Sequence, residues 1–160
     1  ALESSDATPE EAVDDFVGKM NRKAGDLGLM NTYFWNESGL DESEVKGGAY
    51  GTARDVAELM NFVVTKYPEL LEVTQQTSTI ISSETYNHLA RNTNAIAAEI
   101  PGLLASKTGL TDTAGGNLAF IFDPELGRPI VVTILGSTQE GRFEDAKILV
   151  DATLKYIKGK

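Results

Sequence analysis

The sequence contains no cysteine and only one histidine, His88, in 160 residues. The lack of cysteine excludes disulfides, thiolate metal sites and cysteine nucleophiles. One histidine is too few for a histidine-rich metal site, and a serine–histidine–aspartate triad could use only His88. We therefore expect no metal site. No apolar run approaches the roughly 20 residues of a membrane-spanning helix. The chain as given opens with no basic-then-apolar leader, so we expect no signal peptide in it.

Positively charged residues are also scarce. The 14 lysines and arginines stand against 24 aspartates and glutamates, which gives a net charge of −10. Nucleic acid is therefore not expected as a partner, because a protein that binds it must neutralise phosphates. The acidic residues are scattered, as on a solvated surface. A hydrophobic content of 41% over 160 residues is enough for one domain with a core.

Helix-start signals are clear near the beginning of the chain. Thr8 can cap a helix, Pro9 fits its first turn and Glu11 completes a capping box. Gly28 is a natural end for this helix. Residues 29–51 are rich in Asn, Gly, Ser and Asp, and we expect a long irregular segment there.

The remaining expected elements alternate in type. A second helix is expected to begin at Thr52 and to end at Pro68. Short elements should follow, namely a helix at 69–73, a strand at 77–82 and one or two helical turns at 84–90. Three strands and a helix should complete the chain, at 103–108, 117–122, 129–135 and 142–157, with a turn at "DPELG" (123–127).

This order predicts an α+β fold with an antiparallel sheet flanked by helices. We expect residues 1–160 to form a single, partial domain. Residues 1–102 should be its mainly helical portion, and residues 103–160 should contain three strands and a C-terminal helix.

The stretch "LLASKTGLTDTAGGNLAF" (103–120) contains the most informative short motif, Lys107-Thr108-Gly109. Adjacent lysine and threonine residues late in a strand would place an ammonium and a hydroxyl at the same edge of a site. Both groups can donate hydrogen bonds to a carboxylate. Glycine leaves room for a ligand that pairs with the strand. The tripeptide by itself is more typical of an ordinary strand end with a turn.

The surrounding sequence resembles the penicillin-binding, low-molecular-weight D-alanyl-D-alanine carboxypeptidases, relatives of the serine β-lactamases. Lys-Thr-Gly is one of three motifs of that superfamily, beside Ser-x-x-Lys and Ser-x-Asn. The resemblance runs from about residue 13 to the end, in the same order and with similar spacing. It rests on "FVGKMNRKAGDLGLMNTYFWNESGL" (16–40), "YGTARDVAEL" (50–59), "NTNAI" (92–96), "PGLLASKTGLTDTAGGNLA" (101–119) and "VVTILGSTQEGRFEDAKILVD" (131–151).

The resemblance implies a β-lactamase/transpeptidase-like fold and a role for each matching residue. Lys107, Thr108 and Gly109 would line the acyl-transfer site, and Gly109 would let substrate approach the strand. Thr108 and Arg142 would bind the terminal D-Ala carboxylate. Without the resemblance, Arg142 is typical of a surface residue at a helix start. Two further residues could support the rim or simply cap loops, namely Asn92 and Asn94.

Two motifs of the family are missing or altered. Ser-x-x-Lys occurs once, at Ser43 and Lys46, in an acidic loop that does not match the family's nucleophile helix, so we interpret it as coincidence. "LESSDA" (2–7) resembles the family's Ser-Ser-Asn-Asp-Ala without its asparagine, and the helical stretch after it is shortened to residues 8–15. We expect the nucleophile helix and the N-terminal strands to be absent from this chain, and to lie upstream of residue 1 in a complete member. Without a serine nucleophile the chain alone could not be acylated.

The strand expected at 129–135, "PIVVTIL", is apolar and β-branched. Its edge would be unpaired if the N-terminal strands are absent, and such an edge favours aggregation. We therefore expect a second polypeptide, or another copy of this chain, to cover it.

The resemblance implies a serine-type D-alanyl-D-alanine carboxypeptidase that acts on peptidoglycan stem peptides. It implies reaction with β-lactams, a periplasmic or extracellular location, and no metal or organic cofactor. A second hypothesis stays open: a non-catalytic remnant that binds peptidoglycan peptides or a partner protein. A β-lactamase relative is a third alternative, disfavoured because the long match is to the carboxypeptidase pattern.

Overall fold

The computed structural model describes residues 8–124 and 127–159 of the chain. The expected motif at residues 2–7 and the centre of the expected turn at 123–127 lie outside the described residues. The elements, with 3₁₀ helices labelled η, are in order α1 (Pro9–Asp26), β1 (Tyr33–Phe34), β2 (Ala49–Tyr50), α2 (Ala53–Lys66), η1 (Pro68–Leu70), η2 (Glu72–Gln75), β3 (Ser78–Ser82), β4 (Asn87–Arg91), η3 (Ala97–Glu99), β5 (Leu103–Thr111), β6 (Gly115–Phe122), β7 (Ile130–Ser137) and α3 (Gly141–Lys158). None of the helices in this described part is long and apolar enough to cross a membrane.

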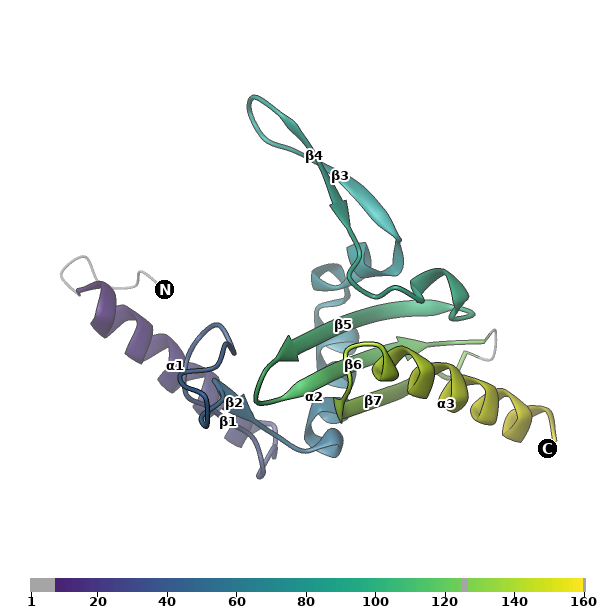
Figure 1. Ribbon diagram of the computed structural model, residues 1–160, viewed down its shortest axis with the longest axis horizontal. Helices are drawn as coiled ribbons and strands as arrows, with labels where there is room; N and C mark the ends of the chain where they lie inside the picture. The colour runs from purple at the N-terminus through teal and green to yellow at the C-terminus, as the bar shows by residue number, and fades with distance from the viewer. Residues whose placement is uncertain (1–7, 125–126, 160) are drawn as a thin grey trace.

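The three C-terminal strands form one antiparallel sheet in the order β5-β6-β7, with α2 on one face and α3 on the other (Figure 1). The expected α+β fold is therefore confirmed. β5 extends past the expected end at residue 108, because Gly109 pairs with Asn117 and Thr111 with Gly115. Lys107 thus lies in the middle of a strand rather than at its end.

Alternation along β6 divides the core into two layers. Leu118, Phe120 and Phe122 face α3, where they pack with Phe143 and Val150. Ala119 and Ile121 of β6 face α2 instead. They form a second buried cluster with Met60 of α2 and Ala105 of β5. Because both faces are covered by helices, β6 is apolar and buried from Leu118 to Phe122, and it lies at the centre of the sheet.

The helix ends follow the expected local signals. Thr8 and Glu11 form the capping box of α1, and Gly28 follows its end with φ of 72°. Thr52 caps α2 by accepting a hydrogen bond from the Asp55 N–H at 3.1 Å. Asn21 of α1 holds β1 through two hydrogen bonds of 2.8 Å with the main chain of Phe34.

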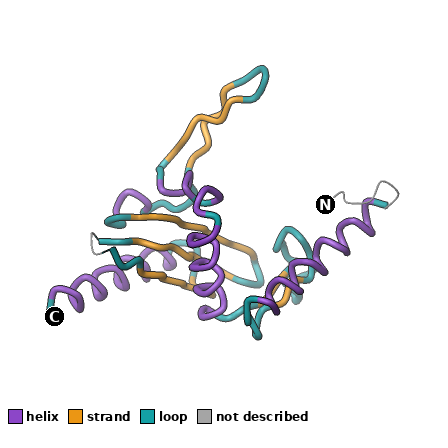
Figure 2. The backbone as a smooth tube through the Cα atoms, turned by 180° about the vertical axis from the view of Figure 1, so that it is seen from behind, coloured by secondary structure: helices purple, strands orange, loops and turns teal. Residues whose placement is uncertain are grey.

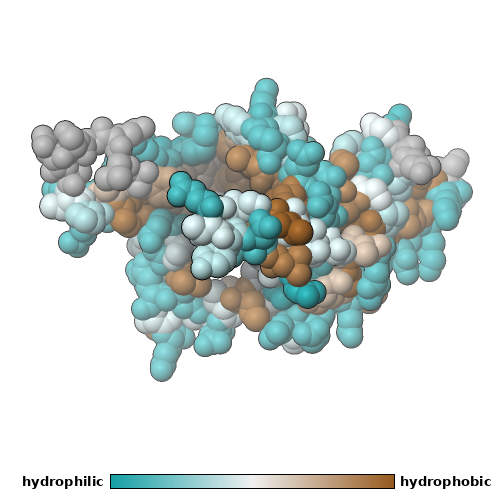
Figure 3. All heavy atoms as spheres, turned by 90° about the horizontal axis from the view of Figure 1, so that it is seen from above, coloured by the Kyte–Doolittle hydropathy of each residue, from teal (hydrophilic) through white to brown (hydrophobic). Residues whose placement is uncertain are grey.

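β3 and β4 form a hairpin that projects from the body of the molecule (Figures 1 and 2). The expected helical turns at residues 84–90 are wrong, because residues 87–91 pair along their whole length with β3. The Ser83 N–H donates to the Tyr86 carbonyl at 2.8 Å and closes the turn. Apolar side chains remain exposed on this hairpin, and brown atoms gather near the middle of the face seen from above (Figure 3). The exposed apolar residues are Ile80, Ile81, Tyr86 and Leu89.

Candidate active site

The outer edge of β5 carries the Lys-Thr-Gly motif. The Ser106 N–H points away from β6 and donates to Thr74 Oγ1 of η2 at 2.9 Å. Main-chain groups of an antiparallel strand alternate between its two edges, so Thr108 and Leu110 also present their N–H and C=O groups outward. Thr74 therefore covers the edge at Ser106, and from Thr108 to Thr111 no strand among the described residues pairs with this edge.

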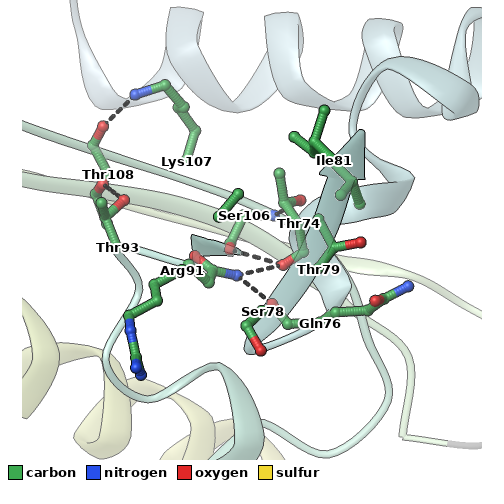
Figure 4. Close-up of a pocket in the computed structure, with 13 residues that line it drawn as sticks. Thr74, Gln76, Ser78, Thr79, Ile81, Arg91, Thr93, Ser106, Lys107 and Thr108 are labelled. Carbon is green, nitrogen blue, oxygen red and sulfur yellow. Dashed lines mark hydrogen bonds between the residues drawn. The ribbon is translucent and has the colours of Figure 1, made fainter. Parts of the chain in front are cut away.

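The side chains of Lys107 and Thr108 lie on opposite faces of β5 but meet at this edge. The Lys107 ammonium reaches round to donate to the Thr108 carbonyl (Figure 4). The Thr108 hydroxyl lies 2.6 Å from the hydroxyl of Thr93, which comes from the loop after β4. The Lys107 ammonium and the two threonine hydroxyls thus lie at the outer edge of β5.

A cavity of about 220 Å³ adjoins the motif and opens to solvent between η2, the β3–β4 hairpin and β5 (Figure 4). Its walls combine hydroxyl, amide and aliphatic side chains with two cations. The lining residues are Val73, Thr74, Gln76, Ser78, Thr79, Ile81, Ala90, Arg91, Asn92, Thr93, Ser106, Lys107 and Thr108.

The base of the hairpin is tied to the strand edge by two polar side chains. The Thr74 hydroxyl accepts from Ser106 and donates to the Leu71 carbonyl at 2.5 Å. Asn92 Nδ2 donates to the carbonyls of Thr74 and Gln76 at 2.8 and 2.9 Å. These contacts hold the hairpin beside Lys107 and Thr108 and so define the walls of the cavity.

Arg142 reaches the motif from the start of α3. Its side chain is 7% exposed, and Nη1 donates to the Gly109 carbonyl at 2.6 Å. The guanidinium also lies 4.7 Å from the ring centre of Phe143, and Nε is buried without a hydrogen-bond partner. Arg142 is not among the described residues that line the cavity. The structure thus brings Arg142 to Gly109, behind the wall formed by Lys107 and Thr108.

The asparagines at 92 and 94 have different surroundings. Asn92 supports the cavity through the contacts above. Asn94 is 2% exposed, and its Oδ1 accepts from the Ile96 N–H at 3.2 Å, which is a loop-capping contact. Sequence reasoning missed Thr74, Thr93 and Ile81, because no local pattern marks a lone hydroxyl or aliphatic residue that meets a distant strand.

The Ser-x-x-Lys match at Ser43 lies in an exposed turn rather than on a helix. The Ser43 N–H donates to the Lys46 carbonyl at 3.2 Å, and the return bond measures 3.3 Å. The Lys46 ammonium is 2.5 Å from Glu42 and 4.0 Å from the ring centre of Trp35. The Lys46 ammonium is thus engaged by Glu42 and by the Trp35 ring.

A second cavity, of about 520 Å³, lies between β1–β2, α2 and the far ends of β6 and β7. Its lining includes Asp55, which is 6% exposed. Burial opposes ionisation of Asp55, but hydrogen bonds from the Asn31 N–H and the Thr32 hydroxyl keep its pKa below the usual value. None of the site residues predicted from the sequence is among the described residues that line this cavity.

Asp41 joins the acidic turn to the β5–β6 turn. Its carboxylate accepts from the hydroxyl and the N–H of Thr113 at 2.5 and 2.9 Å. These two bonds keep the pKa of Asp41 below its ordinary value. The contact is exposed and lies at the opposite end of β5 from the hairpin.

The family model described as D-alanyl-D-alanine carboxypeptidase matches residues 11–137. The chain belongs to this family. The D-alanyl-D-alanine carboxypeptidase DacF of Bacillus subtilis is 32% identical over 139 residues, which are 86% of this chain and 34% of DacF. DacA of Escherichia coli K12 is 31% identical over 150 residues, 91% of this chain and 34% of DacA. The chain thus spans about a third of the length of these curated relatives.

Solved structures of penicillin-binding proteins share the fold of this chain. The D-alanyl-D-alanine carboxypeptidase of Mycobacterium tuberculosis H37Rv aligns with a TM-score of 0.75 and 27% identity, over 89% of this chain and 54% of its own. Penicillin-binding protein D2 of Listeria monocytogenes, in its cefotaxime-bound form, aligns with a TM-score of 0.74 and 29% identity, over 86% and 54%. The same Listeria protein has also been solved in its ampicillin-bound form.

Proposed function

We propose that this chain supplies one wall of a D-alanyl-D-alanine carboxypeptidase site and binds peptides that end in D-Ala-D-Ala. The observation that supports this best is the outer edge of β5, where the Lys107 ammonium and the Thr108 hydroxyl lie beside main-chain groups that pair with no strand among the described residues. An extended peptide can pair with such an edge, and its terminal carboxylate can accept from both side chains.

Each residue of the wall has a proposed role. Thr108 donates its hydroxyl to the terminal carboxylate, and Lys107 supplies positive charge at the same point. Gly109 places no side chain beside the ligand. A Cβ at this position would have only Asn117 Cβ within 4 Å among the described atoms, at 3.6 Å. Arg142 favours the same anion from behind the strand and holds the Gly109 peptide in place.

The proposed reaction is acyl transfer to a serine outside these 160 residues. The serine oxygen forms an ester with the penultimate D-Ala carbonyl, and terminal D-Ala leaves as its nitrogen takes a proton. Water then hydrolyses the ester and regenerates the serine. The turn at Ser43, whose neighbouring Lys46 faces Glu42, is not suited to this step. We therefore propose that the chain alone binds substrate without turnover, and that β-lactams acylate only the complete site.

The exposed turn at Ser43 also favours the second candidate function, a non-catalytic module that holds D-Ala-terminated peptides or a partner protein. Family membership makes peptidoglycan the source of such peptides and a periplasmic or extracellular location the natural one. For β7, we propose that a second polypeptide or another copy of the chain covers its outer edge, since within residues 8–124 and 127–159 no strand pairs there.

Amide NMR titration of the chain with N-acetyl-L-Ala-D-Ala-D-Ala tests the proposed wall. We expect the peptide to shift the amide signals of Thr108, Gly109 and Leu110. The same peptide with a C-terminal amide should bind about tenfold more weakly, because it has no carboxylate to accept from Thr108. Equal affinities for the acid and the amide, or no binding of either peptide, would refute the proposal.

Fluorescent penicillin separates the catalytic from the binding role. The chain alone should form no covalent adduct, since the proposed nucleophile lies elsewhere. Covalent labelling of the purified 160-residue chain would show that it carries its own nucleophile.

A further inference from the structure

The two faces of the β3–β4 hairpin have different environments. In the register of this hairpin Thr79 pairs with Ala90 and Ile81 with His88, so Thr79, Ile81 and Ala90 lie on one face. All three line the cavity beside the Lys107–Thr108 wall (Figure 4). The other face carries the pair of Ile80 and Leu89, neither of which lines the cavity, and only its basal pair, Ser78 and Arg91, reaches the lining. The hairpin therefore presents Thr79, Ile81 and Ala90 to the candidate site, and two of these three side chains are aliphatic.

The contact of Thr74 with the edge of β5 determines the direction in which a bound peptide can lie. Thr74 occupies the edge at Ser106, so an extended ligand can pair only from Thr108 toward Thr111. With its terminal carboxylate at Thr108, the body of the peptide runs along Gly109 to Thr111, antiparallel to β5. The hairpin cavity then lies on the far side of the carboxylate, next to the C-terminal residue of the peptide.

We propose that this cavity is a subsite for the side chain of the ligand's C-terminal residue, and that it accepts an uncharged alkyl group larger than the methyl of alanine. The proposal rests on the proposed function, because the carboxylate at Thr108 sets the register. In acyl transfer the C-terminal residue is the leaving group, so the hairpin determines which leaving groups the site accepts.

The walls of the subsite define its chemistry. Val73, Ile81 and Ala90 offer aliphatic contact, and a cavity of about 220 Å³ has room for several water-sized groups, each of roughly 30 Å³. Lys107 and Arg91 line the same cavity, and their positive charges disfavour a basic side chain there. A linear alkyl chain therefore suits the subsite better than a lysine-like chain of similar length.

Two peptides that differ only in their last side chain test this. N-acetyl-L-Ala-D-Ala-D-norleucine carries three more methylenes than N-acetyl-L-Ala-D-Ala-D-Ala. A fully buried methylene is worth a factor of about four in affinity, and about half burial is expected in an open cavity. By amide NMR titration of the 160-residue chain, the norleucine peptide should bind about eightfold more tightly.

Neighbouring isoleucines provide a matched pair of variants. Ile81→Thr removes aliphatic surface from the subsite and keeps the β-branched shape that strands favour. Ile80→Thr makes the same change on the opposite face, where the side chain is similarly exposed, at 67% against 55% for Ile81. Ile81→Thr should remove most of the eightfold preference, and Ile80→Thr should retain it. Unfolding midpoints of both variants report whether the hairpin still folds.

The outcomes separate this inference from the proposed function. If both peptides shift Thr108 and Gly109 with equal affinity, the wall stands and the subsite is wrong. If Ile80→Thr and Ile81→Thr reduce the preference equally, the cavity face is not responsible and the subsite is also wrong. If neither peptide binds, the subsite and the proposed function both fail.

Discussion

Replacing Thr74 by valine should separate the hairpin from the β5 edge. Valine has the shape of threonine but cannot accept from the Ser106 N–H or donate to the Leu71 carbonyl. The two lost hydrogen bonds are worth about 1 kcal/mol each, and a buried N–H left unpaired adds about 1–3 kcal/mol. Ser106 is 2% exposed, so water can replace the lost acceptor only if the edge opens.

The expected loss is about 3–5 kcal/mol in the free energy of unfolding, which corresponds to a melting temperature roughly 10 °C lower. Urea unfolding followed by circular dichroism measures the loss, and hydrogen exchange at Ser106 locates it. Thr74→Ser keeps the hydroxyl and should restore most of the stability and the protection of the Ser106 amide. A Thr74→Val variant within about 0.5 kcal/mol of wild type, with Ser106 still protected, would refute the reasoning.

Three further predictions concern charges and the Ser-x-x-Lys turn. Hydrogen bonds keep the pKa of Asp55 low, so their stabilising contribution is complete above about pH 4 and is lost as pH falls through the folded pKa. In urea unfolding at a series of acid pH values, wild type should therefore lose more stability than Asp55→Asn. Equal dependence of the free energy of unfolding on pH in the two proteins would contradict this. Arg142→Gln should weaken binding of the D-Ala-D-Ala peptide about tenfold and Arg142→Lys less, whereas unchanged affinity in both variants would remove Arg142 from the site. Ser43→Ala should leave the unfolding midpoint unchanged, and neither wild type nor this variant should be labelled by fluorescent penicillin; labelling of wild type that Ser43→Ala abolishes would identify Ser43 as a nucleophile.

Local signals in the sequence were sufficient for much of the fold. The caps at Thr8 and Thr52 and the stop at Gly28 are determined by side chains within four residues of the helix end. The three C-terminal strands were recognisable from apolar, β-branched runs, though β5 continues beyond the glycine that suggested an end. Pairing with β6 carries it to Thr111, which is a tertiary effect that composition does not encode.

The hairpin was not predictable in the same way. Its turn, Ser83 to Tyr86, lacks the glycine or asparagine that usually identifies a hairpin, so residues 84–90 looked helical. The site depends on contacts between segments far apart in sequence, such as Thr93 with Thr108 and Thr74 with Ser106. The motif at 107–109 was visible in the sequence, but the wall that faces it was not.

The bond between Asp41 and Thr113 has a consequence for the order of folding. It closes a loop of 72 residues, for which chain entropy alone costs about 4 kcal/mol. An exposed contact cannot offset that cost before other interactions have brought its two ends together. The β5–β6–β7 sheet is built from strands adjacent in sequence and can form first. The segment that carries β1 and β2 should therefore dock late, and in a folding experiment the exchange protection of the Thr113 amide should appear after that of the β6 amides.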